Sequence, residues 1–265
     1  MKKVKMKELL EIAIEASVKA GIEILKIYRS DDFEISFKAD NSPLTRADSE
    51  SNLLILSMLN KTGFPVLSEE NKEITFDQRK DWESLWIVDP LDGTKEFIKR
   101  NGEFTVNIAL VENKQAVLGV IYTPVTRELY FAEKDKGSYK AIIDKDYSVK
   151  DIFSSSQKLP FNNNKHYTLV VSRSHMNDKT ESFVRKTEKE KGKINIASRG
   201  SSLKMCMVAE GSADCYPRFA PTMEWDTAAG HAIAKYAGKS VTNIETGEEL
   251  IYNKESLVNP GFIVQ

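Results

Sequence analysis

The stretch Leu85–Thr94 constrains the fold of this chain more than any other. Its first four residues are large and apolar, which predicts a buried β-strand. We expect this strand to end at Asp89, because Pro90 cannot donate to a strand ladder, and Gly93 to permit a sharp turn. Asp89 and Asp92 would then lie close together, where carboxylates repel one another unless cations bind between them. The alternative is that both side chains only cap a local turn.

The first half of the chain carries the pattern of a mixed sheet covered by helices. Residues 7–28 and 53–59 have the apolar spacing of amphipathic helices, and residues 104–132 alternate like an antiparallel meander. We also expect strands near residues 33–38, and at residues 64–70, where the two adjacent glutamates at the strand end would point in opposite directions. The charged stretch 71–83 is expected to be a mobile surface loop.

The second half alternates strands and helices from residue 167 onward, which is typical of an α/β layer. The polar stretch 144–165 has no clear period and predicts a boundary. We therefore expect an N-terminal α+β domain over residues 1–155, with a mostly antiparallel sheet and most of the acidic residues, and a C-terminal α/β domain over residues 156–265.

Composition narrows the classes of function. The 265 residues are 41% hydrophobic and 29% charged, with a net charge of −1, so no nucleic acid polymer is expected as a partner. No apolar run approaches the roughly 20 residues of a membrane span, and the basic N-terminus lacks the apolar core of a signal peptide. Two cysteines are too few for a disulfide framework, and Cys206 lies in an apolar helical pattern. A cytoplasmic location is expected.

Four acidic residues lie where elements are expected to begin or end: Glu69, Asp89, Asp92 and Asp226. Such positions can converge on one cleft. Their oxygen ligands favour Mg²⁺ or Mn²⁺ over zinc. Two such ions about 3.5–4 Å apart form the usual clamp for displacement at phosphorus.

Three further residues surround this group in the sequence. Gly93 and Thr94 would present backbone N–H groups to phosphate oxygens at a helix start. Thr94 could also hold a water whose proton Asp48 accepts. From its position before an apolar helical run, Asp48 is better interpreted as a helix cap.

The segments Asp89–Thr94 and Trp225–Gly230 resemble the two signature motifs of the inositol monophosphatase superfamily, and Leu44–Asp48 and Leu67–Glu70 resemble further family segments. The resemblance implies a layered αβαβα sandwich of the sugar-phosphatase type, with a metal cleft between its two parts. It also implies a Mg²⁺-dependent, lithium-sensitive phosphatase.

Four segments resemble one branch, the bacterial 3'(2'),5'-bisphosphate nucleotidases of the CysQ type: Asp92–Asn107, Gly200–Lys204, Tyr216–Phe219 and Asn259–Phe262. That branch removes the 3'-phosphate of adenosine 3',5'-bisphosphate, a product of sulfate assimilation, and yields AMP and phosphate. The alternatives are inositol monophosphatase or fructose-1,6-bisphosphatase activity, or a non-catalytic cation-binding protein. The family also permits a monomer or homodimer, and peripheral attachment to the cytoplasmic face of the inner membrane.

The resemblance assigns metal ligands residue by residue. Glu69, Asp89 and the carbonyl of Leu91 would bind a first Mg²⁺ ion. Asp89, Asp92 and Asp226 would bind a second, and a third would rest on Glu69 through waters. Mn²⁺ is a possible substitute.

The resemblance also assigns contacts to the substrate. Asp48 with Thr94 would activate the attacking water, and Ser201, Lys204 and Arg218 would face the nucleotide and its remaining phosphate. Each of these three has a structural alternative: a helix N-cap for Ser201, a solvated helix face for Lys204 and an ion pair for Arg218. His175 would either contact the adenine or ribose or lie in a surface loop.

Overall fold

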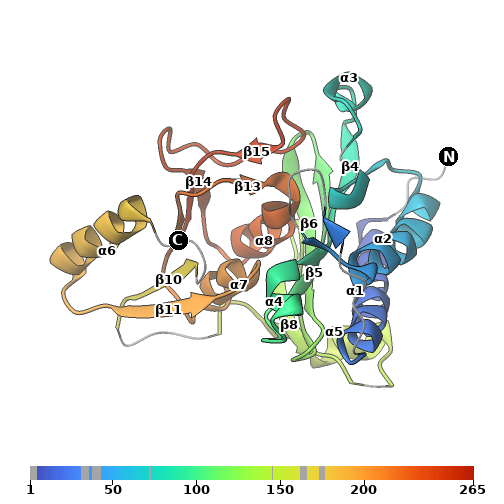
Figure 1. Ribbon diagram of the computed structural model, residues 1–265, viewed down its shortest axis with the longest axis horizontal. Coiled ribbons are helices and arrows are strands. Elements are labelled where there is room, and N and C mark those ends of the chain that lie inside the picture. Colours follow the sequence, from blue (N-terminus) through green and yellow to red (C-terminus); the bar gives the residue numbers. More distant parts are fainter. Residues whose placement is uncertain are drawn as a thin grey trace.

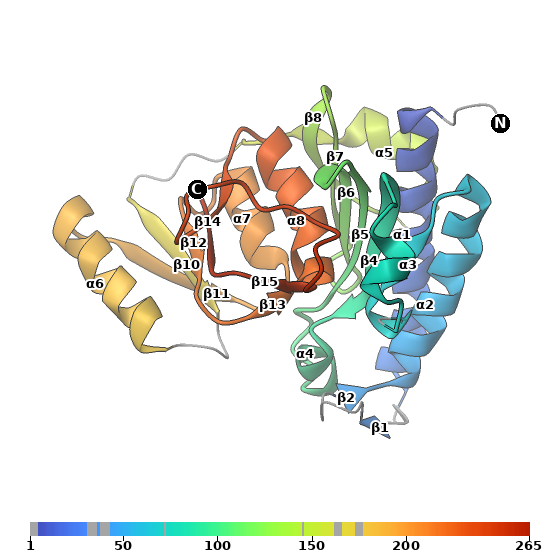
Figure 2. The same ribbon diagram turned by 90° about the horizontal axis from the view of Figure 1, so that it is seen from above.

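Layers of helix and sheet alternate across the molecule (Figure 1), and the same order is visible from above (Figure 2). The computed structural model describes residues 5–30, 36–37, 43–71, 73–144, 146–161, 166–172 and 177–265. Its α-helices are α1 (Met6–Tyr28), α2 (Arg46–Leu59), α3 (Phe76–Arg79), α4 (Thr94–Ile98), α5 (Val149–Ser155), α6 (Asp178–Lys191), α7 (Leu203–Glu210) and α8 (Glu224–Tyr236). The layers run from α1 and α2 through the first sheet, then α7 and α8, then a second set of strands, to α6. This order agrees with the αβαβα sandwich expected from the sequence.

The central layer is a seven-stranded sheet in the order β3-β4-β5-β6-β7-β8-β9. Its strands are β3 (Val66–Ser68), β4 (Ser84–Asp92), β5 (Thr105–Glu112), β6 (Gln115–Thr123), β7 (Glu128–Glu133), β8 (Gly137–Ile142) and β9 (Gln157–Lys158). Only the β3–β4 pair is parallel. The antiparallel meander expected over residues 104–132 is confirmed as β5, β6 and β7.

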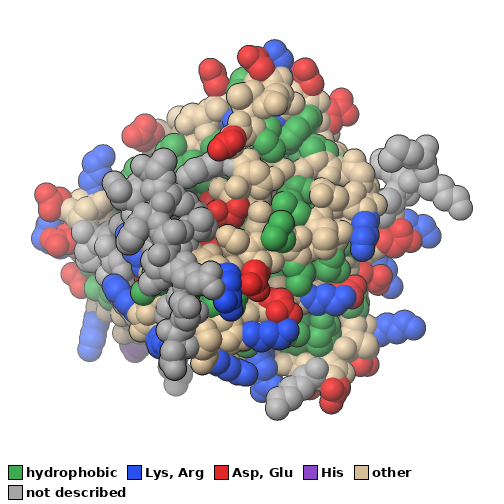
Figure 3. All heavy atoms as spheres, turned by 45° about the vertical axis from the view of Figure 1, so that its right-hand side comes forward, with side chains coloured by type: hydrophobic (Ala, Val, Ile, Leu, Met, Phe, Trp, Pro, Cys, Tyr) green, Lys and Arg blue, Asp and Glu red, His purple; other side chains and the backbone are tan. Residues whose placement is uncertain are grey.

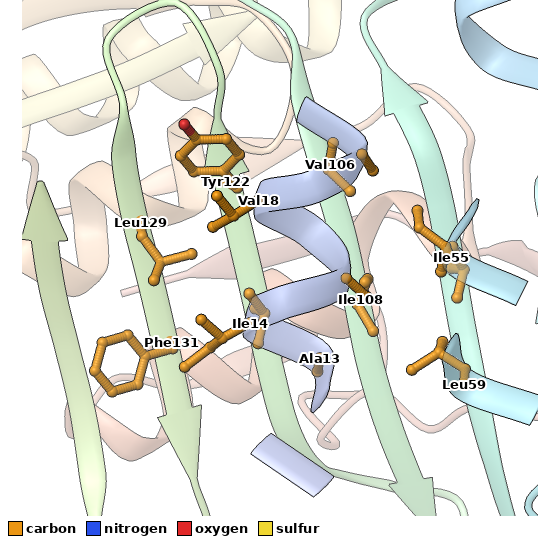
Figure 4. Packing of buried hydrophobic residues seen from close by; sticks show 14 of the residues in the cluster. Ala13, Ile14, Val18, Ile55, Leu59, Val106, Ile108, Tyr122, Leu129 and Phe131 are labelled. Atoms are coloured by element: carbon orange, nitrogen blue, oxygen red, sulfur yellow. The ribbon is translucent and has the colours of Figure 1, made fainter. Parts of the chain in front are cut away.

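Helices α1 and α2 cover one face of this sheet. Ile14 and Val18 of α1 point toward the strands, beside Ile108 of β5 (Figure 4). Alternate strand residues face opposite sides of a sheet, and β4 follows this rule: Trp86 packs toward α1 and α2, whereas Ile87 packs toward α8. Both faces of the sheet are therefore buried.

Helix α8 covers the opposite face of the sheet, and its backbone lies unusually close to β6. A Cβ atom added at Gly119 of β6 would lie 2.3 Å from the carbonyl oxygen of Ala229, so only glycine fits there. Likewise, a Cβ at Gly230 would lie 2.6 Å from the sulfur of Met205 in α7. These small residues fix α8 against the sheet, and with it Asp226 in the first turn of α8.

The second layer of strands is built from short segments. Parallel β10 (Thr168–Ser172) and β11 (Asn195–Arg199) adjoin the group β12 (Tyr216–Arg218), β16 (Phe262–Val264) and β14 (Val241–Asn243) through a bridge between Leu169 and Cys215. Val170 packs toward α7 and α8, and Val171 packs toward Val184 of the outer helix α6. Two further pairs are β1 (Ser36–Phe37) with β2 (Pro43–Leu44) and β13 (Thr222–Met223) with β15 (Val258–Asn259).

Several local expectations were wrong. The strand expected to stop at Asp89 continues to Asp92, because a β-bulge carries Pro90 and Leu91 past the single residue between Asn107 and Thr105 of β5. Strand β3 ends at Ser68, so Glu69 and Glu70 lie in a 3₁₀ helix, Glu69–Asn71, and not at a strand end.

Two stretches expected to be irregular contain regular structure. Residues 71–83 include α3, whose Arg79 is only 2% exposed because its guanidinium donates to Asn253 Oδ1 (2.8 Å) and the carbonyl of Lys254 (2.6 Å). Residues 144–165 include α5 and β9. Strand β9 extends the first sheet to Lys158, past the boundary expected at residue 155. The division of the chain into two domains therefore stays a prediction.

The described surface has mixed charge. Lysine and arginine side chains alternate with aspartate and glutamate over the described part of the face in Figure 3, in keeping with the net charge of −1. Among the described helices, none has the length and apolar character needed to cross a bilayer.

Candidate active site

The bulge in β4 fixes Asp89 as a buried carboxylate. The side chain is 1% exposed, and its Oδ1 accepts a hydrogen bond from the backbone N–H of Leu91 at 3.1 Å. Pro90 has no N–H, and its carbonyl accepts from the hydroxyl of Ser51 in α2 at 2.8 Å. The sequence predicts a sharp turn after Asp89. In the structure this turn is fixed by the hydrogen bond from Leu91 to Asp89 and by the hydrogen bond from Ser51 to Pro90.

Asp89, Asp92 and Asp226 converge although Asp226 lies more than a hundred residues further along the chain. One carboxylate oxygen from each lies within 4.8 Å of the other two. Asp226 is held by the backbone N–H of Met223, which donates to its Oδ2 at 2.8 Å. Burial, together with the neighbouring carboxylates, raises the pKa of Asp89 and of Asp226 well above the ordinary aspartate range.

The residues that orient Asp92 were not singled out from the sequence. Its Oδ2 accepts from the backbone N–H of Ser202 at 2.7 Å and lies 2.9 Å from the Ser202 hydroxyl. That hydroxyl also lies 2.8 Å from the carbonyl oxygen of Asp226 and accepts from the Asn107 amide at 2.9 Å. Ser202 therefore links the two halves of the carboxylate cluster. The sequence signals for it were its place just before α7 and its position within the Gly200–Lys204 segment.

Glu69 comes from the turn after β3 and lines the same pocket as Asp92 and Asp226. Its charge contributes to the raised pKa of Asp89. The structure thus brings Glu69 to the cluster, although by way of a 3₁₀ turn.

Asp48 joins the site through Thr94. The hydroxyl of Thr94 lies 3.3 Å from Asp48 Oδ1 and 3.4 Å from the carbonyl oxygen of Leu91. The other oxygen of Asp48 accepts from the backbone N–H of Thr45 at 2.8 Å and from its hydroxyl at 2.6 Å. Asp48 lies at the third position of α2 in a capping box. The capping interpretation therefore holds for one oxygen, and the other faces Thr94.

A pocket of about 330 Å³ opens over the cluster. It is lined by the predicted residues Glu69, Asp92, Gly93, Thr94, Ser201, Lys204, Arg218 and Asp226, and by Ser202, Tyr216, Thr222 and Phe262 among others. Asp48, Asp89 and Leu91 are buried, each about 1% exposed, and do not line the pocket themselves. A glycine is required at position 93, where φ is +94° and a Cβ would lie 3.1 Å from the carbonyl oxygen of Glu103.

Lys204 does not lie on a solvated helix face. It is 5% exposed, its ammonium donates to the carbonyls of Ser201 (2.5 Å) and Arg199 (3.2 Å), and it lies 5.5 Å from the centre of the Tyr216 ring. Burial lowers the pKa of Lys204 to about 8, although the nearby Asp92 opposes this shift. A buried ammonium beside a pocket is suited to binding an anion, because little water competes with the ligand.

The two other predicted substrate residues also meet the pocket. The alternative of an ion pair for Arg218 is not seen in the part of the chain that the structure describes: its guanidinium donates to the carbonyls of Ala220 (3.1 Å) and Pro221 (3.3 Å). Ser201 has a left-handed φ of 48° and shares a hydrogen bond of 2.9 Å with Thr105; the N-cap of α7 is Ser202. His175 lies outside the described residues.

The carboxylate cluster fits a divalent metal ion. All its ligand atoms are carboxylate oxygens, the donors preferred by Mg²⁺ and Mn²⁺. The pKa values of Asp89 and Asp226 are raised first by burial and then by the neighbouring carboxylates, and a bound cation would oppose both effects. Two other acids have structural contacts: Asp214 accepts from the N–H of Thr168 (2.7 Å), and Glu224 is fully buried against Lys254.

Known proteins resemble this chain over nearly its whole length. The 3'(2'),5'-bisphosphate nucleotidase CysQ of Salmonella typhimurium is 43% identical over 261 residues, which cover 97% of this chain and 99% of that protein. The protein of the same name from Escherichia coli K12 is 41% identical with the same coverage.

Solved structures also resemble this chain. CysQ from Bacteroides thetaiotaomicron, described as a bacterial member of the inositol monophosphatase family, is 52% identical, with a TM-score of 0.90 and 97% of each chain covered. The inositol monophosphatase of Thermotoga maritima shares the fold, at 24% identity, a TM-score of 0.72 and coverage of 97% and 91%. The inositol monophosphatase family matches residues 5–262. The resemblance noted in the sequence is therefore confirmed: this chain belongs to the inositol monophosphatase family.

Proposed function

We propose that this protein hydrolyses the 3'-phosphate of adenosine 3',5'-bisphosphate to give AMP and inorganic phosphate. The observation that carries the proposal is that one pocket contains both the carboxylates Asp92 and Asp226 and the cations Lys204 and Arg218. A substrate with two phosphates needs positive side chains beyond those that hold metal ions. Relatives that are 41–43% identical over nearly the whole chain bear the name 3'(2'),5'-bisphosphate nucleotidase, which supports this substrate.

The metal ligands in this proposal are Asp89, Asp92, Asp226, Glu69 and the carbonyl of Leu91. They would hold two or three Mg²⁺ ions, with Mn²⁺ as a substitute. Bound ions of this kind neutralise developing charge on a phosphoryl group and on the leaving oxygen, and lower the pKa of water. The protein contributes the fixed positions of the oxygens, set by the bulge in β4 and by Ser202.

Asp48 and Thr94 receive a proton in this proposal. The attacking water donates to Thr94 Oγ1, whose hydroxyl hydrogen bonds with Asp48 Oδ1 at 3.3 Å. As the water oxygen bonds to phosphorus, one of its protons passes toward Asp48 and the bond from phosphorus to the ribose 3'-oxygen breaks. The 3'-oxygen leaves as a hydroxyl after taking a proton from solvent. This route forms no covalent phospho-enzyme.

Lys204, Arg218 and Ser201 would bind the part of the substrate that does not react. The ammonium of Lys204 is fixed by two carbonyls, and the guanidinium of Arg218 by two others. Both cations are therefore already positioned before the substrate binds, which lowers the entropic cost of binding the 5'-phosphate. We also expect the enzyme to act in the cytoplasm as a monomer or homodimer.

The direct test is phosphate release from a panel of adenosine 3',5'-bisphosphate, inositol 1-phosphate and fructose 1,6-bisphosphate, each with Mg²⁺ and with a chelator. The proposal predicts the highest kcat/KM for the nucleotide and no turnover with the chelator. A higher kcat/KM for inositol 1-phosphate would assign the protein to the alternative activity, and turnover unaffected by the chelator would contradict the metal site.

A further inference from the structure

The C-terminal segment 253–259 wraps around the start of α8, which carries Asp226. Strand β15 pairs with β13, and Thr222 lies opposite Asn259. The peptide group between Met223 and Glu224 is held on both sides by this segment: the N–H of Glu224 donates to the carbonyl of Leu257 at 3.0 Å, and the Met223 carbonyl accepts from the Asn259 amide at 2.8 Å.

Asn259 contacts residues on both sides of Asp226. Its side chain is 4% exposed, and its Nδ2 lies 2.8 Å from the carbonyl oxygen of Met223 and 2.9 Å from the hydroxyl of Thr227. A third acceptor, the hydroxyl of Thr222, lies 3.2 Å away. The buried Asn259 amide therefore connects Met223, three positions before Asp226, with Thr227, directly after it.

The orientation of the Asn259 amide follows from the chemistry of its partners. The ammonium of Lys254, which can only donate, lies 3.2 Å from Asn259 Oδ1 and is itself held by Glu224 at 2.6 Å. The Met223 carbonyl can only accept. The amide oxygen must therefore face Lys254, and the nitrogen must face Met223.

We propose that Asn259 is a positioning residue for Asp226, acting through Met223 and Thr227. The N–H of Met223 is the donor that orients Asp226 Oδ2, at 2.8 Å. If the Asn259 amide is removed, the Met223 carbonyl and the Thr227 hydroxyl lose their shared donor, and the Met223 N–H is held less firmly toward Asp226. The inference rests on the proposed function only in that Asp226 binds a metal ion.

The same segment offers a matched control. Asn253 is also an asparagine and is 2% exposed, with Oδ1 accepting from Arg79 Nη1 and Nδ2 donating to the carbonyl of Arg79, both at 2.8 Å. Among the described residues, its side chain holds α3 and does not hydrogen bond with Met223 or Thr227. Because Asn253 has a left-handed φ of 57° and its backbone N–H donates to Glu224 Oε2 at 2.6 Å, the control is Asn253→Gly, which removes the side chain, adds no left-handed strain and keeps that backbone donor.

The experiment is calorimetric titration of Mg²⁺ into the substrate-free full chain, with the thermal midpoint of unfolding measured in parallel without metal. Partners that orient a metal ligand commonly contribute 10–100-fold to metal affinity. We expect Asn259→Ala to weaken Mg²⁺ binding about 10- to 100-fold, and Asn253→Gly to change it less than about threefold. We expect both variants to lower the metal-free midpoint.

Two results would overturn the inference: an unchanged Mg²⁺ affinity in Asn259→Ala, or equal weakening in both variants. If Asn259→Ala does not fold, Asn259→Ser takes its place with the same two outcomes, because the serine hydroxyl is too short to reach both partners. Absence of Mg²⁺ binding to the wild-type chain would instead contradict the proposed function, so the two failures are distinguishable.

Discussion

Ser202 donates its backbone N–H to Asp92 Oδ2 at 2.7 Å, across 110 positions of sequence. Its hydroxyl lies within 2.9 Å of the same oxygen and 2.8 Å from the carbonyl oxygen of Asp226. One serine thus fixes the separation between Asp92 of β4 and Asp226 of α8. Because the two elements belong to different layers of the fold, this contact sets the geometry of the proposed metal site.

Removing the Ser202 hydroxyl should therefore impair the reaction more than the fold. A hydrogen bond to a charged group contributes about 1.5–3 kcal/mol, so we expect Ser202→Ala to lower kcat/KM about 10- to 100-fold. Ser212→Ala is the control, since that hydroxyl contacts Met207 and Glu210 at the other end of α7. Steady-state kinetics at saturating Mg²⁺ would contradict this role if the two variants were equally active.

The elements predicted from the sequence are those whose signals are local. The apolar run before Asp89 and the small residues of α8 were sufficient to place the two aspartate motifs. The bulge after Asp89 was not predictable, because it depends on the register with β5. Arg79 was assigned to a loop because its partner Asn253 lies 174 positions away.

In the candidate site, too, features that depend on distant residues could not be predicted. The sequence around Lys204 was compatible with a solvated helix face. Only the packing of α7 against β10 and α8 shows that the side chain is buried. Ser202 and Asn107 were missed because their function comes from hydrogen bonds to distant residues. The expected element ends already grouped Glu69 with the three aspartates, and the family resemblance added the assignment of each acid to a particular metal ion.

Substrate binding should weaken at alkaline pH. The pKa of Lys204 is lowered to about 8, so the ammonium is charged below that pH and is lost as the pH rises through it. We expect KM for adenosine 3',5'-bisphosphate to rise between pH 8 and pH 9.5, and Lys204→Ala to raise KM at pH 7 without affecting inositol 1-phosphate. A KM for the nucleotide that stays constant over this range in the wild type, or equal losses on both substrates in the variant, would argue against a phosphate contact.

Stabilisation by Mg²⁺ should increase with pH. Because the pKa values of Asp89 and Asp226 are raised, the contribution of these two groups to the stability of the metal-free fold is most favourable below the ordinary aspartate pKa of about 4. This contribution is lost as the pH rises through the raised values. Mg²⁺ binds the deprotonated form, so its binding releases protons. We expect the Mg²⁺-induced rise in the melting temperature to be larger at pH 8 than at pH 6. An equal or smaller rise at pH 8 would contradict this linkage.

The contact between β6 and α8 should tolerate no side chain at position 119. A Cβ there would lie 2.3 Å from the carbonyl oxygen of Ala229, so we expect Gly119→Ala to lower the free energy of unfolding by about 3 kcal/mol. Gly247→Ala is the control: φ is +73° and no heavy atom lies within 4 Å, so only a backbone cost of about 1–2 kcal/mol is expected. Urea unfolding curves compare the two, and equal losses would show that the close approach of α8 is not required.

The central claim is that Asp92 belongs to a metal-dependent catalytic site. The most direct measurement is turnover of adenosine 3',5'-bisphosphate by Asp92→Asn at saturating Mg²⁺, with circular dichroism and the melting temperature recorded on the same sample. The account predicts that kcat falls by about 10²–10³-fold or more, with a native spectrum and a cooperative unfolding transition. Hydrolysis at the wild-type rate by the folded variant would contradict it.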